Sequence, residues 1–238
     1  TPQGFGSGEK PQKMRFNKRT SCVRCGKCCS MSSPSLLKED MALFLSGVLS
    51  YDNTYTIRGG ERIRSKGDGE IYESSVELIK IKDKDGTSVC VFYKDKEGCS
   101  IYENRPSQCR IYKCWQMLTS KNLMSGLEEG ALKRSDIFGS VDLLMEVMKK
   151  HEEKCAYKKL SDALERLADG WEDAVEDIMD MLQYDTYIRP FLEEKFNIPQ
   201  NAMDLILGRP LINTINEFGF KVVKDGDDYI LLPIKEEQ

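Results

Sequence analysis

The sequence predicts an α+β protein in which a small cysteine-rich metal-binding unit with a short β-rich insert precedes a mainly helical region that ends in a β-hairpin. Three observations predict this class. Eight of the nine cysteines fall between residues 22 and 114, β-favouring runs broken by glycines fill residues 51–93, and apolar residues at helical spacing dominate from residue 141. A chain of 238 residues has room for one large domain or two small ones.

The first twenty residues predict a flexible basic arm. They contain five lysines and arginines together with glycine and proline, and few large apolar side chains. Only Phe5 and Phe16 offer rings on which nucleic-acid bases stack, so we expect a solvated tail rather than a nucleic-acid contact. The arm has no apolar run typical of a secretion signal.

The next two elements are a helix and a β-rich insert. Residues 35–45 predict a short helix with Ser35 as its N-cap, because their apolar residues recur near helical spacing. In the insert, Ile79-Lys-Ile81 alternates as a half-buried strand does, and Thr87–Tyr93 predicts the last strand. This insert is expected to return Cys90 towards the first cysteine group.

The remaining chain predicts helices and a terminal hairpin. Apolar residues recur on one helical face in residues 141–150 and 160–168, and residues 172–183 continue the pattern with acidic residues on the outer face. These carboxylates lack the Glu-x-x-His pair of di-metal bundles, so we expect a solvated face. Two apolar runs on either side of Asp225-Gly226 predict the hairpin.

The cysteine spacing is the strongest functional signal. A first group follows the pattern C-x2-C-x2-C-C, and the wider second group contains four more: Cys22, Cys25, Cys28, Cys29 and Cys90, Cys99, Cys109, Cys114. Two-residue spacers let one tight turn direct successive thiolates at one centre, and Gly26 supplies the backbone freedom that such a turn often requires. Thiolate ligands favour zinc, iron in iron–sulfur clusters or Cu(I), and they exclude magnesium and calcium. Packing alone does not explain this clustering.

The ninth cysteine has a different environment. Cys155 stands alone on a predicted helix, where a packed core thiol is expected. His151, the only histidine, lies one helical turn before it, but two side chains do not make a metal site. An odd cysteine count and the adjacent pair Cys28 and Cys29 fit a disulfide framework poorly. We therefore expect the cytoplasm or another reducing compartment.

Three segments of the chain resemble the YkgJ-type cysteine-cluster family. They are Cys22-Val-Arg-Cys-Gly-Lys-Cys-Cys29, Gly98-Cys-Ser-Ile-Tyr-Glu-Asn-Arg-Pro-Ser-Gln-Cys-Arg110 and Cys114-Trp115. That family is a zinc- or iron-chelating domain, similar in its cysteine pattern to flagellin lysine N-methylase. The resemblance covers about residues 20–116 and implies that the metal ligands are Cys22, Cys25, Cys28, Cys29, Cys90, Cys99, Cys109 and Cys114.

The resemblance also suggests how the chain divides. A flexible arm is expected at residues 1–20, a cysteine-cluster metal-binding domain at residues 21–118, and a helical C-terminal region with the terminal hairpin at residues 119–238. The helical region matches no family that its sequence pattern identifies.

Arginines beside the cysteines are candidates for a supporting role. A thiolate-bound centre is anionic, so nearby cations stabilise it. Arg105 and Arg110 bracket Cys109, and we expect them to offset its charge and to hydrogen-bond to sulfur or backbone atoms. Arg24 and Lys27 lie between ligands of the first group, where they serve the same purpose or remain plain surface cations.

The spacing favours an iron–sulfur cluster over zinc. Three cysteines at two-residue spacing match the start of the bacterial ferredoxin run, although Ser32 stands where the fourth ligand would follow. Eight thiolates would also make two four-cysteine zinc sites. The second group, however, lacks the paired C-x2-C knuckles that structural zinc sites favour.

Three functions are compatible with the sequence. The first is an iron–sulfur protein that acts in electron transfer, with a redox partner, or as a cluster-dependent enzyme. The second is a non-enzymatic zinc module whose acidic helical tail binds a protein partner. The third is a metallochaperone or redox sensor that uses the adjacent thiols of Cys28 and Cys29. No dinucleotide fingerprint, P-loop or nucleophile elbow supports another reaction.

Charge and hydropathy exclude two further classes. The chain has 35 basic and 39 acidic residues, a balance that excludes a globally basic nucleic-acid binder. Its mean hydropathy is −0.48. The longest apolar stretches fall well short of the ~20 residues that a membrane helix requires, so we expect no membrane span.

Overall fold

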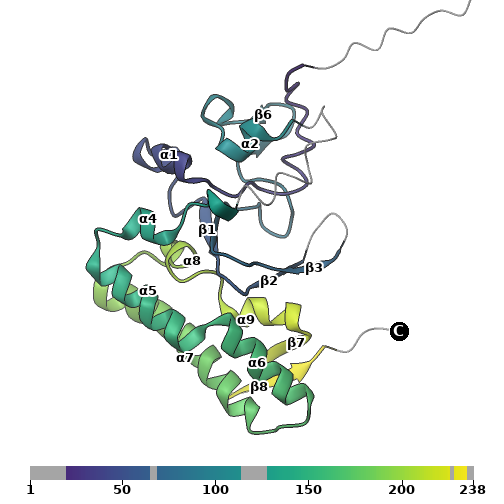
Figure 1. Cartoon of the computed structure of the whole chain (residues 1–238), viewed down its shortest axis with the longest axis vertical. Coiled ribbons are helices and arrows are strands. Elements are labelled where there is room, and N and C mark those ends of the chain that lie inside the picture. Colours follow the sequence, from purple (N-terminus) through teal and green to yellow (C-terminus); the bar gives the residue numbers. More distant parts are fainter. Residues whose placement is uncertain (1–19, 65–68, 114–127, 226–227, 235–238) are drawn as a thin grey trace, which may run out of the picture.

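The computed structural model describes residues 20–64, 69–113, 128–225 and 228–234 (Figure 1). Its short strands, helices and terminal hairpin confirm the predicted α+β class. The cysteine-rich half lies at the top of Figure 1, and the longer helices lie at the bottom with the hairpin beside them. The predicted basic arm lies outside the described residues apart from Thr20.

The first half of the chain contains only short elements. They are η1 (Lys38–Asp40), α1 (Met41–Leu45), β1 (Thr54–Ile57), β2 (Arg62–Arg64), β3 (Ile71–Glu73), β4 (Leu78–Ile81), β5 (Tyr93–Lys94), β6 (Gly98–Cys99), η2 (Tyr102–Asn104) and α2 (Ser107–Ile111). The strands pair antiparallel in three two-stranded sheets: β1 with β4, β2 with β3, and β5 with β6.

The second half is mainly helical. Its elements are α4 (Arg134–Phe138), α5 (Asp142–Cys155), α6 (Tyr157–Ala168), α7 (Ala174–Phe196), η3 (Gln200–Ala202), α8 (Met203–Ile206), α9 (Leu211–Thr214), η4 (Ile215–Phe218), β7 (Phe220–Asp225) and β8 (Asp228–Pro233). Strands β7 and β8 pair from Phe220↔Pro233 to Asp225↔Asp228, which confirms the predicted hairpin. None of the described helices is long and apolar enough to cross a membrane.

Residues 34–37 form an extended connection between the two halves. The Leu36 amide donates to the Ile79 carbonyl at 2.8 Å, and the Leu36 carbonyl accepts from the Leu132 amide at 3.0 Å. Ser35 forms a β-bridge rather than an N-cap. The predicted helix over residues 35–45 is therefore wrong in its first part, because these backbone groups pair across the fold instead of along a helix.

The segment Thr87–Tyr93 is not the continuous strand that the sequence predicts. Its central residue, Cys90, donates its amide to the Cys29 carbonyl at 2.7 Å and forms a single bridge to Asp83. Only Tyr93 and the next residue enter a strand pair, with β6. The backbone of this segment is thus used to attach the second cysteine group to the first, which is the return of Cys90 that the sequence predicted.

The alternation predicted for Ile79-Lys-Ile81 is confirmed in β4. Ile79 and Ile81 are buried, whereas Lys80 between them is half-exposed. The two isoleucines pack in one core with residues from distant parts of the chain: Leu36, Leu49, Cys90, Leu132 and Leu205. Because Leu132 and Leu205 belong to the second half, the two halves share this core.

The predicted helices of the second half are present with different bounds. Of the predicted segments, residues 142–150 lie in α5, residues 160–168 lie in α6, and residues 174–183 form the first part of the longer α7, which continues through Pro190. The acidic residues on the outer face of α7 are exposed, as predicted. Cys155 is fully buried in the core between α6 and α7, which confirms its expected role as a packed thiol.

Buried charged residues join the two halves. Arg58 follows β1 and is fully buried; its Nη1 donates to the Cys155 carbonyl at 3.1 Å and lies 3.4 Å from His151 Nδ1. On the other side of the ring, His151 Nε2 lies 2.8 Å from Asp185 Oδ1. A donor on one side and a carboxylate on the other fit a neutral imidazole that carries its proton on Nε2.

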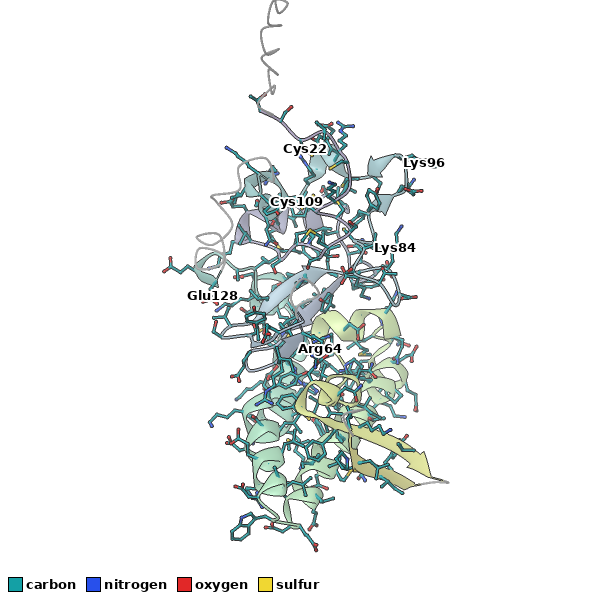
Figure 2. All side chains as sticks on the ribbon, turned by 90° about the vertical axis from the view of Figure 1, so that its right-hand side faces the viewer. Cys22, Arg64, Lys84, Lys96, Cys109 and Glu128 are labelled. Atoms are coloured by element: carbon teal, nitrogen blue, oxygen red, sulfur yellow. The ribbon has the colours of Figure 1, made fainter. Side chains whose placement is uncertain are left out.

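Asp185 is the centre of this network. Besides His151, its carboxylate accepts hydrogen bonds from Arg189 Nη2 at 3.0 Å and from the Leu211 amide at 2.8 Å. A further hydrogen bond between the two halves runs from the Thr56 hydroxyl to the Leu205 carbonyl at 2.7 Å. Figure 2 shows the labelled Arg64 at the level where the two halves meet.

Acidification is expected to destabilise the protein through this network. Burial and the charge of Arg58 lower the pKa of His151, although Asp185 opposes them. Burial raises the pKa of Asp185, but the hydrogen bond from His151 and the charge of Arg189 outweigh it and lower this pKa to about 2. As the pH falls through about 6.5 and then about 4, this histidine and this aspartate bind protons in the unfolded chain but not in the folded protein. The stability of the folded protein therefore falls as the pH drops through these values.

Thermal unfolding across about pH 7 to pH 5 tests this expectation. His151 is the only histidine, so the variant His151→Gln should lose less stability over this range than the unmodified protein does. Every other titrating group is common to both proteins, and the difference between them isolates His151. Equal pH dependence in the two proteins would show that His151 is not held neutral.

Candidate metal centre

The first cysteine group lies on a tight loop. The Ser30 amide donates to the Gly26 carbonyl at 2.9 Å, and Gly26 has a φ of +74°, in the left-handed region that glycine tolerates. A Cβ at Gly26 would also overlap the Tyr93 ring. The backbone freedom expected of Gly26 is therefore used in its φ. The close contact with Tyr93 gives a second reason for glycine at this position.

Alanine at Gly26 is expected to destabilise the cysteine-rich half by about 1–3 kcal/mol and to lower the metal content. The matched control is Gly47→Ala, since Gly47 also has a φ of +74° but no atom within 4 Å of the added Cβ. Urea unfolding and metal analysis of both variants check the prediction. Equal effects in the two variants would mean that the contact with Tyr93 does not matter.

Three short segments place the described cysteines of the second group. Cys90 is bound to the first loop through the Cys29 carbonyl, Cys99 lies on β6 opposite Tyr93, and Cys109 lies in α2. Helix α2 has no N-cap side chain of its own. The carboxylate of the buried Asp40 caps the helix instead. Its Oδ1 accepts hydrogen bonds from the Ser107 amide at 2.7 Å and from the Ser107 hydroxyl at 2.9 Å.

Two adjoining cavities gather the predicted ligands. One, of about 380 Å³, is lined largely by apolar side chains and by five thiols: Cys28, Cys29, Cys90, Cys99 and Cys109. The other, of about 290 Å³, is lined by arginines and by six thiols: Cys22, Cys25, Cys28, Cys29, Cys99 and Cys109. Four cysteines, two from each group, line both cavities. Figure 2 shows the labelled Cys22 and Cys109 in the same upper part of the molecule.

The thiols in these cavities do not form a closed ligand shell. Within the described ranges, no group of three or more His, Cys, Asp or Glu side chains is arranged to hold one metal ion. Cys114 lies outside the described residues. The chemistry of the cavity walls nevertheless fits a soft metal, because sulfur is the donor atom common to both cavities. The one carboxylate among their described lining residues, that of Glu128, accepts a hydrogen bond from the Ser75 hydroxyl at 2.8 Å.

The adjacent thiols of the first group contact each other. The Sγ atoms of Cys28 and Cys29 lie 3.9 Å apart. The hydrogen bond from Cys29 lowers the pKa of Cys28 to about 6, against the effect of burial, and the same bond together with burial raises the pKa of Cys29. Cys28 is therefore the thiol most easily deprotonated in this pair, and thiolate is the form that binds a metal.

The thiols of the second group are harder to deprotonate. Burial raises the pKa of Cys90 and of Cys99, and it raises that of Cys109 to about 12. Arg105 opposes this effect at Cys99 and Cys109, because its positive charge favours the thiolate. Metal binding must release these protons, so the affinity for metal is expected to fall as the solution becomes more acidic.

The predicted arginines differ in their surroundings. Arg105 lines the second cavity with the thiols, and its guanidinium lies 3.7 Å from the centre of the Tyr102 ring. Arg110 lines the same cavity but donates to the Ser107 hydroxyl at 2.7 Å. Arg24 pairs with Glu103 at 2.9 Å, and Lys27 is an exposed residue.

Sequence reasoning did not find three residues that shape this site. They are Tyr93, which fills the space beside Gly26, Tyr102, which stacks with two arginines, and Asp40, which holds the start of α2. Only for Asp40 did the sequence offer an indication. Pro106 stands at the N-cap position of α2 and has no capping side chain, so the cap must come from another segment of the chain.

The fold brings the described thiols of both groups together, as a cysteine-rich metal-binding domain requires. Residues 21–128 match the family described as "CxxCxxCC: Putative zinc- or iron-chelating domain". This match confirms the resemblance to the cysteine-cluster family, and it extends about a dozen residues beyond the segment that the sequence motifs cover. No curated protein and no solved structure matches the chain.

Proposed function

We propose that this protein holds an iron–sulfur cluster through its clustered cysteines and acts in electron transfer or in a cluster-dependent reaction. The observation that carries the proposal is the shared wall of the two cavities, in which Cys28 and Cys29 of the first group stand with Cys99 and Cys109 of the second. Two separate four-cysteine zinc sites, one for each group, would keep these pairs apart. Because cysteines of both groups line the same cavities, a single larger metal centre is favoured over two separate sites.

The proposed ligands come from both cysteine groups: Cys22, Cys25, Cys28, Cys29, Cys90, Cys99 and Cys109, together with Cys114. An iron–sulfur cluster supplies one-electron redox chemistry when it is bound. The protein's own contribution is the set of thiolates, the apolar wall that limits access of water on one side, and the positive charge of Arg105 on the other. A reducing compartment and a redox partner belong to this proposal.

The domain division of the chain also belongs to this proposal. The metal-binding domain is placed at residues 21–118 and the helical region at residues 119–238. The hydrogen bond between Leu36 and Leu132, and the common core that includes Leu205, support a close association of the two. The helical region therefore serves as a support on which the metal-binding domain is built.

Anaerobic purification followed by visible spectroscopy and metal analysis tests the proposal. We expect a brown protein with sulfur-to-iron charge-transfer absorption, and with iron and acid-labile sulfide in comparable amounts. A colourless protein that contains zinc and no sulfide would overturn the iron–sulfur proposal. That result would instead support a structural zinc module whose metal contributes folding free energy.

A further inference from the structure

A stack of three side chains connects the two cysteine groups. The guanidinium carbon of Arg24 and that of Arg105 each lie 3.7 Å from the centre of the Tyr102 ring. Arg24 lies between Cys22 and Cys25, whereas Arg105 stands two residues before the start of α2, the helix that contains Cys109. A ring can bind two guanidinium groups at this distance only on its two opposite faces, so the ring lies between the two loops.

The two arginines of this stack differ in how their charge is compensated. Arg24 Nη2 lies 2.9 Å from Glu103 Oε1, so a carboxylate pairs with it. No carboxylate of the described chain pairs with Arg105, and its Nε is shielded from water without a hydrogen-bond acceptor. A shielded donor without an acceptor typically costs about 1–3 kcal/mol, which makes an anionic partner at this point favourable.

The anionic groups nearest at hand are the cysteines. Arg105 lines the second cavity together with the thiols of both groups. A metal bound by four thiolates carries a net negative charge, and guanidinium groups donate well to such sulfur atoms. Stacking on Tyr102 fixes the guanidinium plane in advance, so little side-chain entropy would be lost when the centre forms.

We propose that Arg105 donates its free N–H groups to the sulfur atoms of the loaded centre, and that Tyr102 positions it for this role. The inference rests on the metal centre proposed above, but not on the choice between iron and zinc, since both give an anionic thiolate centre. Arg105 is thus a positioning and charge-compensating residue rather than a metal ligand.

Arg110 provides the matched comparison. It lines the same cavity and lies one residue after Cys109, but its Nη2 donates to the Ser107 hydroxyl at 2.7 Å and lies 3.9 Å from Asp40 Oδ1. Its charge therefore already has a partner in Asp40. Loss of Arg110 should leave the centre nearly unchanged, although Arg110 is closer to Cys109 in the sequence than Arg105 is.

The test measures how fast the purified, metal-loaded protein loses its metal to an excess of a chromogenic chelator. We expect Arg105→Gln to lose metal about 10- to 100-fold faster than the unmodified protein. Arg105→Lys should lie between the two, because it keeps the charge but not the planar fork. Tyr102→Leu should also accelerate the loss, and Arg110→Gln should stay within about twofold of the unmodified protein.

A second readout applies where the metal is iron. Removal of a cation beside a cluster disfavours the more negative, reduced state, so Arg105→Gln should shift the midpoint potential to a more negative value. Arg110→Gln should leave it in place. Thermal unfolding of the metal-free variants identifies any that fail to fold, and Arg105→Lys and Tyr102→Leu then remain as tests.

The possible outcomes separate this inference from the proposed function. An unmodified protein that holds no metal would overturn both. A metal-loaded protein in which Arg105→Gln changes neither the rate of metal loss nor the potential would overturn only the role of Arg105. Equal effects of Arg105→Gln and Arg110→Gln would also overturn it, because they would reflect general charge and not a specific contact.

Discussion

Serine in place of Cys109 is expected to remove the bound metal. Cys109 lines both cavities, and it is held in α2, whose start is fixed by Asp40. Burial raises the pKa of its thiol to about 12, so metal binding must supply the free energy that removes this proton. A serine hydroxyl is a harder donor that soft metals disfavour, and it does not replace the thiolate.

Iron, sulfide and zinc content per chain, measured after anaerobic purification, checks this prediction. We expect at least a tenfold loss in Cys109→Ser, and the same in Cys22→Ser. The control is Cys155→Ser, since Cys155 is a buried thiol of the helical core that lines neither cavity. Full retention of metal in Cys109→Ser would show that the proposed ligand set is wrong, and loss of metal in Cys155→Ser would show that a general loss of folding explains the result.

Alanine in place of Asp185 is expected to destabilise the whole protein by about 3–5 kcal/mol. The side chain is 1% exposed, and its carboxylate accepts hydrogen bonds from His151, Arg189 and the Leu211 amide. Its removal leaves a buried positive charge without its nearest partner. It also leaves two further buried donors without an acceptor, which adds to the cost.

Urea unfolding measures this effect, and Asp180→Ala is the matched control. Asp180 belongs to the same helix, α7, but its side chain is 62% exposed and lies 3.6 Å from Lys154. An exposed pair of this kind contributes at most about 1 kcal/mol, so the control should unfold at nearly the same urea concentration as the unmodified protein. A similarly small effect in Asp185→Ala would mean that the buried network does not hold the two halves together.

Periodicity predicted the elements whose faces differ clearly in polarity. Ile79 and Ile81 in β4, and Leu160 and Leu164 in α6, are buried at the positions that the pattern predicts. These elements satisfy their backbone hydrogen bonds locally or with a neighbouring strand. Their apolar residues then face a single core, so the spacing of these residues along the sequence is enough to predict the elements.

Periodicity failed where the backbone pairs with distant segments. Residues near Ser35 have helical spacing, but Leu36 bonds instead to Ile79 and Leu132. The segment around Cys90 has strand-like composition, but the Cys90 amide donates to the Cys29 carbonyl in the first cysteine loop. In both segments tertiary hydrogen bonds outweigh local preference, and a single sequence carries no signal for such partners.

The candidate site was predictable in its chemistry and less so in its environment. Cysteine spacing identified the residues that line the two cavities, because thiolate ligation requires cysteine and little else. The sequence could not distinguish the roles of Arg105 and Arg110, which both stand within four residues of Cys109. Their difference depends on Asp40 and Tyr102, which come near them only in the folded protein.

The backbone of Leu36 pairs with Ile79 and with Leu132, which both follow it in the chain, so this part of the fold cannot form until both have been synthesised. The first cysteine loop leaves the ribosome before the residues that complete its cavity walls, among them Cys90, Cys109 and Glu128. Contacts across so many residues form later than local ones. The nascent thiols of this loop are thus open to oxidants and competing metals during translation, and we expect loading of the finished chain to be a post-translational step.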